Sequence, residues 1–150
     1  MTDLQTVLNR SVENASPFTR SLFEKSQWDA ARVATFVNEQ HGLTVATVSK
    51  DGEPHAAVVI AGFLDGAIHF TVSPRSVLLR NLKRSGRVAF SVCGGEHNVM
   101  GQGTAVVAAR SLDDPELIER LAAASSVGKF TPPGWDGFIY RIDVDRIFAN

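Results

Sequence analysis

Apolar and polar residues alternate along much of this chain, in short segments bounded by turn residues. The pattern predicts six strands, over residues 43–49, 54–63, 67–73, 87–93, 98–109 and about 138–148. Asp51-Gly52 and Asp65-Gly66 are typical of tight hairpin turns and separate the first three strands. We therefore expect these three strands to form an antiparallel meander.

Three other segments follow a helical period. Residues 27–40 place small and branched apolar side chains on one face, with Ser26 as the expected N-cap and Gly42 as the expected stop. Residues 76–84 have the pattern of a short amphipathic helix. The sequence Asp113-Asp114-Pro115 opens a further helix of about ten residues, with acidic residues and proline at its start.

Six strands with few helices favour a mainly β fold, a closed or nearly closed barrel with helices at its ends. Alternating strand–helix–strand units are absent, which argues against a doubly wound parallel sheet. Gly101 and Gly103 inside the fifth strand predict sharp curvature or a close backbone approach. Residues 1–16 are polar and are expected to be an N-terminal arm, either flexible or a short helix that orders only against another surface, and residues 17–150 a single domain.

Composition narrows the class of protein. The chain has 150 residues, enough for one domain, and a formal net charge of −1, which supports neither a nucleic-acid nor a membrane partner. Cys93 is the single cysteine, so an intrachain disulfide and a cysteine-rich zinc site are excluded. No apolar run approaches the roughly 20 residues that span a bilayer, and the first ten residues do not resemble a signal peptide. We expect a cytoplasmic protein.

Charge is unevenly distributed despite the neutral balance. Between Gly66 and Gly95 there is no Asp or Glu. The basic residues in that stretch are Arg75, Arg80, Lys83, Arg84 and Arg87. It includes Ser73-Pro74-Arg75-Ser76, where a strand ends and a helix begins. Helix N–H groups, hydroxyls and a guanidinium suit a phosphate, although a solvated basic helix with Ser76 as a plain N-cap explains the same residues.

The histidines, the cysteine and Trp135 give less specific indications of function. The histidines are His41, His55, His69 and His97, and no pair has the spacing of metal ligands, so we predict no metal site. His55 follows Pro54 in a strand and could line a pocket. A barrel pocket that presents one histidine leaves haem open as a ligand, but nothing in the sequence singles out which histidine. No nucleophile motif is present, and we expect Cys93 to be a buried, inert thiol. Trp135 either plugs a pocket or packs at a dimer seam. We assign no catalytic residue.

Three segments carry a resemblance to a known family. They are LTVATVSKDGEPHAAVVIAGF (43–63), GAIHFTVSPRSVLLRNLKRSGRVAFSV (66–92) and MGQGTA (100–105). Together they resemble the pyridoxamine 5'-phosphate oxidase-like family of FMN-binding split β-barrels, which includes actinobacterial enzymes that use a deazaflavin coenzyme. The resemblance covers about residues 27–148. It implies a six-stranded antiparallel split β-barrel of Greek-key type, a homodimer, and two cofactor sites along the dimer interface.

The resemblance also implies where the cofactor lies. The backbone of Val58 and Val59 would lie beside the flavin ring, with Thr71 and the Ser73–Ser76 turn near the ribityl chain and phosphate. Asn98 stands where the family often has a glutamine that reaches the flavin. With the two arginines considered below, the expected cofactor-binding residues are Val58, Val59, Thr71, Ser73, Arg75, Ser76, Arg80 and Asn98.

This chain departs from the family at the usual basic phosphate ligands. Those positions hold Ala57, Val77 and Leu78. An apolar side chain cannot neutralise a phosphate, so we expect Arg75 and Arg80 to compensate. The residues that bind the substrate phosphate are not recognisable near the C-terminus, which argues against a true pyridoxamine phosphate oxidase.

The prediction is therefore an FMN- or deazaflavin-dependent oxidoreductase that acts on a small-molecule redox substrate. The alternative is a non-enzymatic split barrel that binds haem, another anionic ligand or no cofactor.

Overall fold

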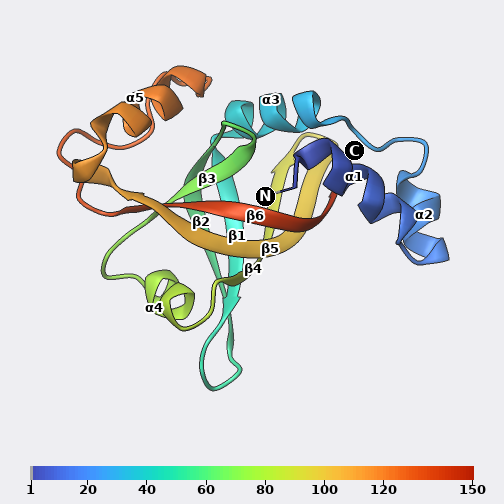
Figure 1. The fold of residues 1–150 in the computed structure, drawn as a ribbon, viewed down its shortest axis with the longest axis horizontal. Helices are drawn as coiled ribbons and strands as arrows, with labels where there is room; N and C mark the ends of the chain where they lie inside the picture. The colour runs from blue at the N-terminus through green and yellow to red at the C-terminus, as the bar shows by residue number, and fades with distance from the viewer. Residues whose placement is uncertain (1) are drawn as a thin grey trace.

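Residues 2–150 are described by a computed structural model, and they form a six-stranded barrel (Figure 1). The strands are β1 (Gly42–Val48), β2 (Pro54–Leu64), β3 (Ala67–Val72), β4 (Arg87–Gly94), β5 (His97–Arg110) and β6 (Phe138–Ala149). They close in the order β1-β2-β3-β6-β5-β4, and every neighbouring pair is antiparallel. The predicted antiparallel split barrel of Greek-key type is confirmed.

The turns and bends follow the glycines of the sequence. Asp65 and Gly66 both take positive φ values, 50° and 80°, in the β2–β3 turn, which favours glycine or aspartate there. On β5, a Cβ added at Gly101 or Gly103 would lie 2.5 Å or 2.3 Å from a backbone oxygen of β6. The register shifts between Gln102 and Gly103. Glycine at these two positions therefore lets β5 approach β6 closely as the barrel curves.

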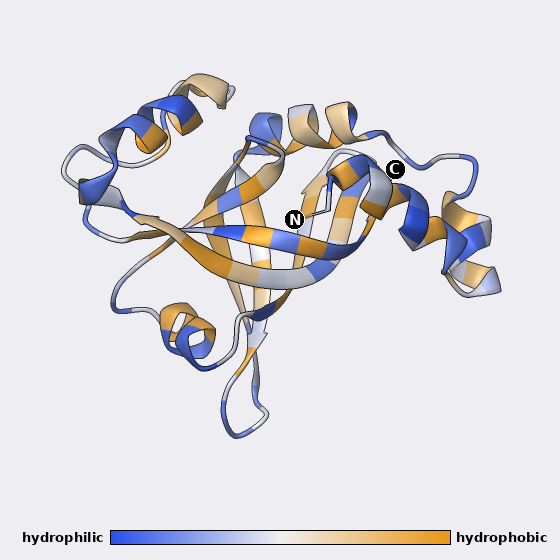
Figure 2. Cartoon of the chain, in the orientation of Figure 1, coloured by the Kyte–Doolittle hydropathy of each residue, from blue (hydrophilic) through white to orange (hydrophobic). Residues whose placement is uncertain are grey.

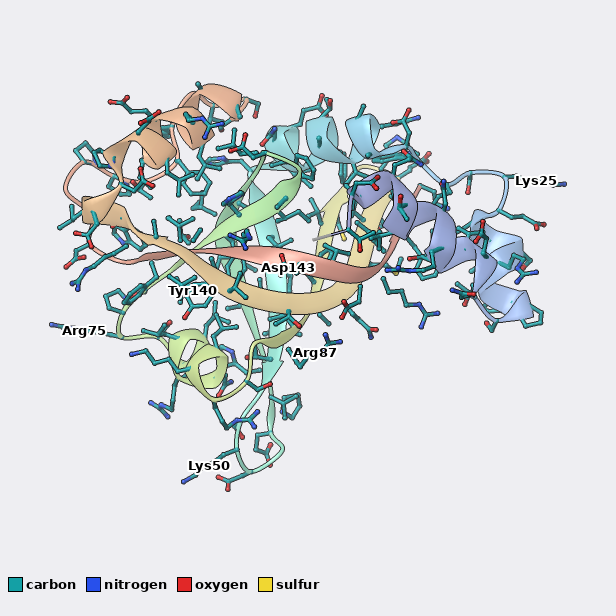
Figure 3. The ribbon with its side chains drawn as sticks, in the orientation of Figure 1. Lys25, Lys50, Arg75, Arg87, Tyr140 and Asp143 are labelled. Carbon is teal, nitrogen blue, oxygen red and sulfur yellow. The ribbon has the colours of Figure 1, made fainter. Side chains whose placement is uncertain are left out.

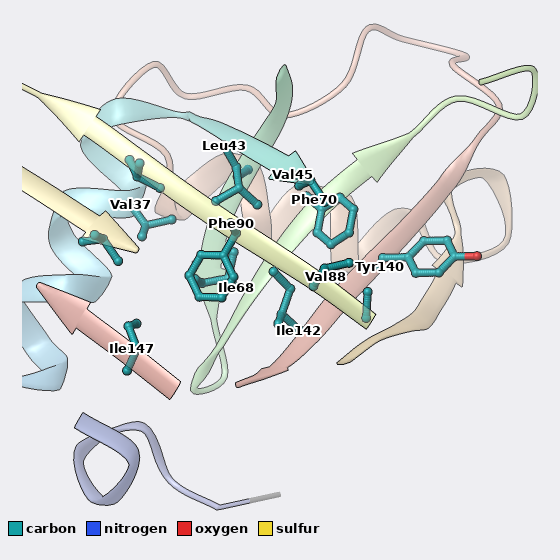
Figure 4. Close-up of a cluster of buried hydrophobic side chains, with 14 of the residues drawn as sticks. Val37, Leu43, Val45, Ile68, Phe70, Val88, Phe90, Tyr140, Ile142 and Ile147 are labelled. Atoms are coloured by element: carbon teal, nitrogen blue, oxygen red, sulfur yellow. The ribbon is translucent and has the colours of Figure 1, made fainter. Parts of the chain in front are cut away.

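Alternate residues of each strand fill the barrel interior (Figure 4). Labelled members of this core are Val45, Phe70, Val88, Phe90 and Ile142, and all are buried. Figure 2 shows the matching alternation of polar and apolar residues along β6. Each fully buried side chain of this size contributes about 1.5–3 kcal/mol, so the period-two pattern fixes which face of every strand points inward.

Helices cover the ends and flanks of the barrel (Figure 1). They are α3 (Ala30–Gln40), α4 (Val77–Arg84) and α5 (Pro115–Ala124), with a short 3-10 turn, η1 (Ser111–Asp113), before α5. Asn38 of α3 binds both backbone groups of Phe63, accepting from its N–H at 2.7 Å and donating to its carbonyl at 3.2 Å. This pair fixes α3 against β2. No helix within residues 2–150 has the length and hydropathy to cross a bilayer.

The predicted start of α3 is wrong by three residues. The helix begins at Ala30, and Asp29 rather than Ser26 is the N-cap, accepting from Arg32 N at 2.9 Å. Residues 27 and 28 are held by the last strand instead, since Trp28 N donates to the carbonyl of Ala149 at 2.9 Å. At the other end, His41 takes the left-handed conformation, with φ 57°, that was expected of Gly42.

The N-terminal residues contain two helices, α1 (Leu4–Glu13) and α2 (Pro17–Phe23). Leu4, Val7 and Leu8 are buried against the barrel core. The Ser11 hydroxyl accepts from Ile147 N at 3.0 Å. The segment assigned to an arm, apart from Met1 outside the described residues, thus includes a helix packed on β6. Sequence analysis missed α2, which projects beside α1 (Figure 1).

Candidate functional site

A groove with a volume of about 580 Å³ lies between β2, the start of α4 and the segment 130–135. Its walls are mainly apolar. The residues that line it are Gly42, His55, Ala57, Val58, Val59, Ile60, Thr71, Ser73, Ser76, Val77, Leu78, Phe130, Thr131, Pro132 and Trp135. A volume of this size is within the range of small-molecule and cofactor sites.

Strand β2 supplies the apolar floor. Its residues alternate, so that Ala57 and Val59 pack toward the core while Val58 and Ile60 face out. Val58 is 81% exposed, which is unusual for a valine in the middle of a strand. A planar apolar ligand laid on this surface would cover it.

The start of α4 supplies the polar end of the groove. Ser76 is the N-cap, and its hydroxyl accepts from Leu79 N at 3.1 Å and donates to the Ser73 carbonyl at 2.7 Å. The N–H groups of Val77 and Leu78 open the helix and have no intrahelical acceptor. With the partial positive charge of the helix N-terminus, they favour an anion at this position.

Val77 and Leu78, two of the apolar residues at the expected basic positions, differ in how far they are buried. Leu78 is 2% exposed and belongs to the barrel core, whereas Val77 is 40% exposed beside the groove. The backbone N–H of Leu78, rather than its side chain, is therefore what this residue offers to a ligand.

The two arginines expected to compensate lie outside the groove lining. Arg75 and Arg80 are exposed, and Figure 3 shows the Arg75 side chain pointing away from the barrel. Neither forms an ion pair with any residue from 2 to 150. Both are close to the Ser76 N-cap in sequence, since Arg75 directly precedes it and Arg80 follows one helical turn later.

Of the eight expected cofactor-binding residues, the structure gathers five at one groove. These are Val58, Val59, Thr71, Ser73 and Ser76. Asn98 is elsewhere, at the start of β5, where its N–H donates to the Asn150 carbonyl at 2.8 Å. Within one copy of the chain, Asn98 is thus not part of this groove.

The third wall of the groove is formed by residues 130–135, of which the sequence analysis singled out only Trp135. Ser111 holds this segment by donating to the Trp135 carbonyl at 2.7 Å and accepting from Gly137 N at 3.0 Å. Arg110 and Asp136 add a two-bonded ion pair at 2.8 and 2.9 Å. The pair raises the pKa of Arg110 and lowers the pKa of Asp136. The only signal in the sequence was the tryptophan within an irregular Pro-Pro-Gly segment.

His55 also lines the groove. Its Nδ1 is buried without a hydrogen-bond partner among residues 2–150. His41, by contrast, is occupied, because its Nδ1 shares a hydrogen bond of 2.9 Å with the Ser125 hydroxyl. Burial lowers the pKa of His41, with a smaller contribution from Lys129.

The remaining candidates lie apart from the groove. Cys93 is exposed, so the expectation of a buried thiol is wrong, because this position on β4 alternates with the buried Val92 and points outward. Within residues 2–150 no three His, Cys, Asp or Glu side chains come together as metal ligands.

A family model described as pyridoxamine 5'-phosphate oxidase matches residues 30–148. The chain therefore belongs to the pyridoxamine 5'-phosphate oxidase family, in agreement with its split barrel. No functionally curated protein matches the chain in sequence.

Solved structures share the fold. The conserved hypothetical protein Rv2991 from Mycobacterium tuberculosis is 25% identical, with a TM-score of 0.65, over 81% of this chain and 84% of that one. A haem-binding protein from Mycobacterium smegmatis is 22% identical, with a TM-score of 0.61, over 83% of this chain and 55% of its own. The haem storage protein HutZ from Vibrio cholerae is 15% identical, with a TM-score of 0.57, over 79% of this chain and 92% of that one.

Proposed function

We propose that this chain binds a flavin-type cofactor, FMN or a deazaflavin, in the groove and acts as an oxidoreductase on a small-molecule redox substrate. One observation carries the proposal. The groove is apolar along β2 and ends at the N-terminus of α4, where hydroxyls and free N–H groups gather. A flavin phosphate has a similar arrangement along its length, with a planar aromatic ring at one end and an anion at the other.

The residues present fit such a group. The open face of Val58 would lie against the ring, and Thr71, which also lines the groove, would lie near the ribityl chain. Ser73, Ser76 and the first N–H groups of α4 would bind the phosphate. When bound, the cofactor supplies the hydride chemistry, and the chain orients it and excludes water from one ring face. No side chain in the groove is assigned as a catalytic acid or base.

A homodimer is part of the proposal. Paired residues of β2, β1, β4 and β5 form a patch on the outer face of the barrel that has no charged side chain of its own and is bordered by Arg87 of β4 and Arg146 of β6. They are Thr44, Ala46, Val48, Ala56, Val58, Ile60, Ala89, Ser91, Cys93, Asn98, Met100 and Gln102. This uncharged face exposes large apolar side chains, which favours contact with a second copy. Asn98 lies on it and would act across the dimer, on the partner's cofactor.

The test is the absorbance spectrum and mass of whatever co-purifies, followed by titration of the cofactor-free protein with FMN and with a deazaflavin. We expect saturable binding of at least one, with quenching of its fluorescence. A protein that binds neither contradicts the proposal.

Haem binding is a second candidate. It is supported by structural neighbours described as haem-binding and haem storage proteins, and by His55, the histidine in the groove. A Soret band that appears on haem addition and is lost in His55→Ala would favour haem over flavin.

A further inference from the structure

His55 is the one titratable side chain among the residues that line the groove. It precedes Ala57 by two positions on β2, so both side chains leave the same face of the strand. The rest of the lining provides hydroxyls, backbone groups and apolar surface, but no lysine or arginine.

The surroundings of the His55 imidazole determine which of its two ring nitrogens carries the proton. Nδ1 is buried and has no hydrogen-bond partner, and Nε2 is neither buried nor bonded within residues 2–150. A proton on Nδ1 would be an unsatisfied buried donor, which is costly. The neutral ring therefore carries its proton on Nε2, and this residue of the groove lining keeps an unbonded Nε2–H donor for a ligand.

We propose that His55 donates this Nε2–H to the phosphate of the cofactor, opposite the hydroxyl and N–H groups at the start of α4. The inference rests on the proposed function and extends it by naming a binding residue. Ser73 and Ser76 approach the anion from α4, while His55 approaches it from β2. The anion would thus be bound by groups from both walls, in addition to Arg75 and Arg80, which lie outside the groove lining and are expected to turn toward it.

The experiment compares FMN with riboflavin, which has the same ring and no phosphate. Dissociation constants are measured by fluorescence quenching for the wild type, His55→Ala, His55→Gln and the control His97→Ala, which alters an exposed histidine outside the groove. We expect His55→Ala to weaken FMN binding about tenfold, the effect of losing one such hydrogen bond. Riboflavin binding should be unchanged. His55→Gln, which keeps a donor, should lose less.

Equal losses for FMN and riboflavin, or no loss for either, would overturn the role of His55. A haem complex with His55 as its iron ligand would overturn it as well. Inorganic phosphate separates this inference from the proposed function. If the wild type binds no flavin but phosphate shifts the NMR signals of the His55 ring and not those of His97, the anion contact stands and the flavin function fails. If phosphate shifts neither ring and no flavin binds, both are wrong.

Discussion

The side-chain amide of Asn81 donates a hydrogen bond to the hydroxyl of Thr47 at 3.0 Å, and both residues are buried. The bond joins α4 to β1 across 34 positions of the chain. Since the first turn of α4 forms one end of the groove, this buried pair helps to set where the anion-binding groups lie.

Thr47→Val keeps the shape of the side chain and removes the acceptor. The Asn81 amide is then buried without a partner, so we expect a loss of about 1–3 kcal/mol in the free energy of unfolding. Urea denaturation measures it. Thr35→Val, at an exposed position of α3, is the control and should change stability by about 0.5 kcal/mol or less. Similar values for the two variants would contradict this role for the pair.

Ser11 ties α1 to the last strand. In Ser11→Ala the N–H of Ile147 loses its acceptor at a buried site, and we expect a loss of about 1–3 kcal/mol. Hydrogen exchange at the Ile147 amide should become faster. Ser21→Ala, which removes an exposed hydroxyl on α2, should leave that amide unchanged. If exchange at Ile147 is the same in both variants, α1 does not stabilise β6 through this bond.

Arg75 and Arg80 are predicted to turn toward a bound phosphate. Arg75→Ala and Arg80→Ala should each weaken FMN binding by about ten- to a hundredfold if each forms a charge-assisted hydrogen bond. Arg32→Ala, which removes an arginine stacked on Trp28 away from the groove, is the control. Unchanged FMN affinity in both Arg75→Ala and Arg80→Ala would show that these arginines do not compensate for Ala57, Val77 and Leu78.

Met100→Glu tests the uncharged face. Met100 is 42% exposed on β5, so a single chain tolerates the glutamate, whereas a dimer would bury its charge. We expect a monomer in analytical ultracentrifugation, with FMN affinity reduced because Asn98 of the second copy is lost. Val107→Glu changes another exposed position seven residues along the same strand. If both variants are monomers, or if both remain dimers, the result would argue against this face as the dimer interface.

The lowered pKa of the buried His69 predicts that the protein loses stability in acid. Burial lowers its pKa from the ordinary value of 6.5, although the carbonyl of Ala67, which accepts from Nδ1 at 3.1 Å, acts in the opposite direction. The unfolded chain then binds the proton more readily, so this contribution is complete above pH 6.5 and is lost as the pH falls below it. The pKa of His41 is lowered as well, so His41 also makes the protein less stable as the pH falls.

The measurement is the melting temperature of wild type and His69→Gln between about pH 8 and 5, around the ordinary titration of histidine. The variant should show a flatter profile, with a residual slope from His41. An identical slope in the two proteins would assign the acid sensitivity to other groups.

Local patterns determined most of the fold. A period of two along six segments, with glycine turns between them, is sufficient to predict the strands, because each alternation encodes one buried face. The N-cap of α4 at Ser76 was also readable, since a cap depends on neighbours within four residues. The sequence thus predicted the strands that carry Val58 and Thr71 and the turn that carries Ser73 and Ser76, while the family resemblance implied that these residues share a cofactor site.

Contacts between distant segments decided the rest. The start of α3 depends on the bond between Trp28 and Ala149, and the third wall of the groove depends on Ser111 holding Trp135. The isolation of Nδ1 of His55 is likewise set by what packs around β2. No local period encodes these features, because each depends on which remote group supplies a hydrogen-bond partner or withholds one. The sequence determined the barrel and the capped helix, and only the tertiary structure decided which side chains share the groove.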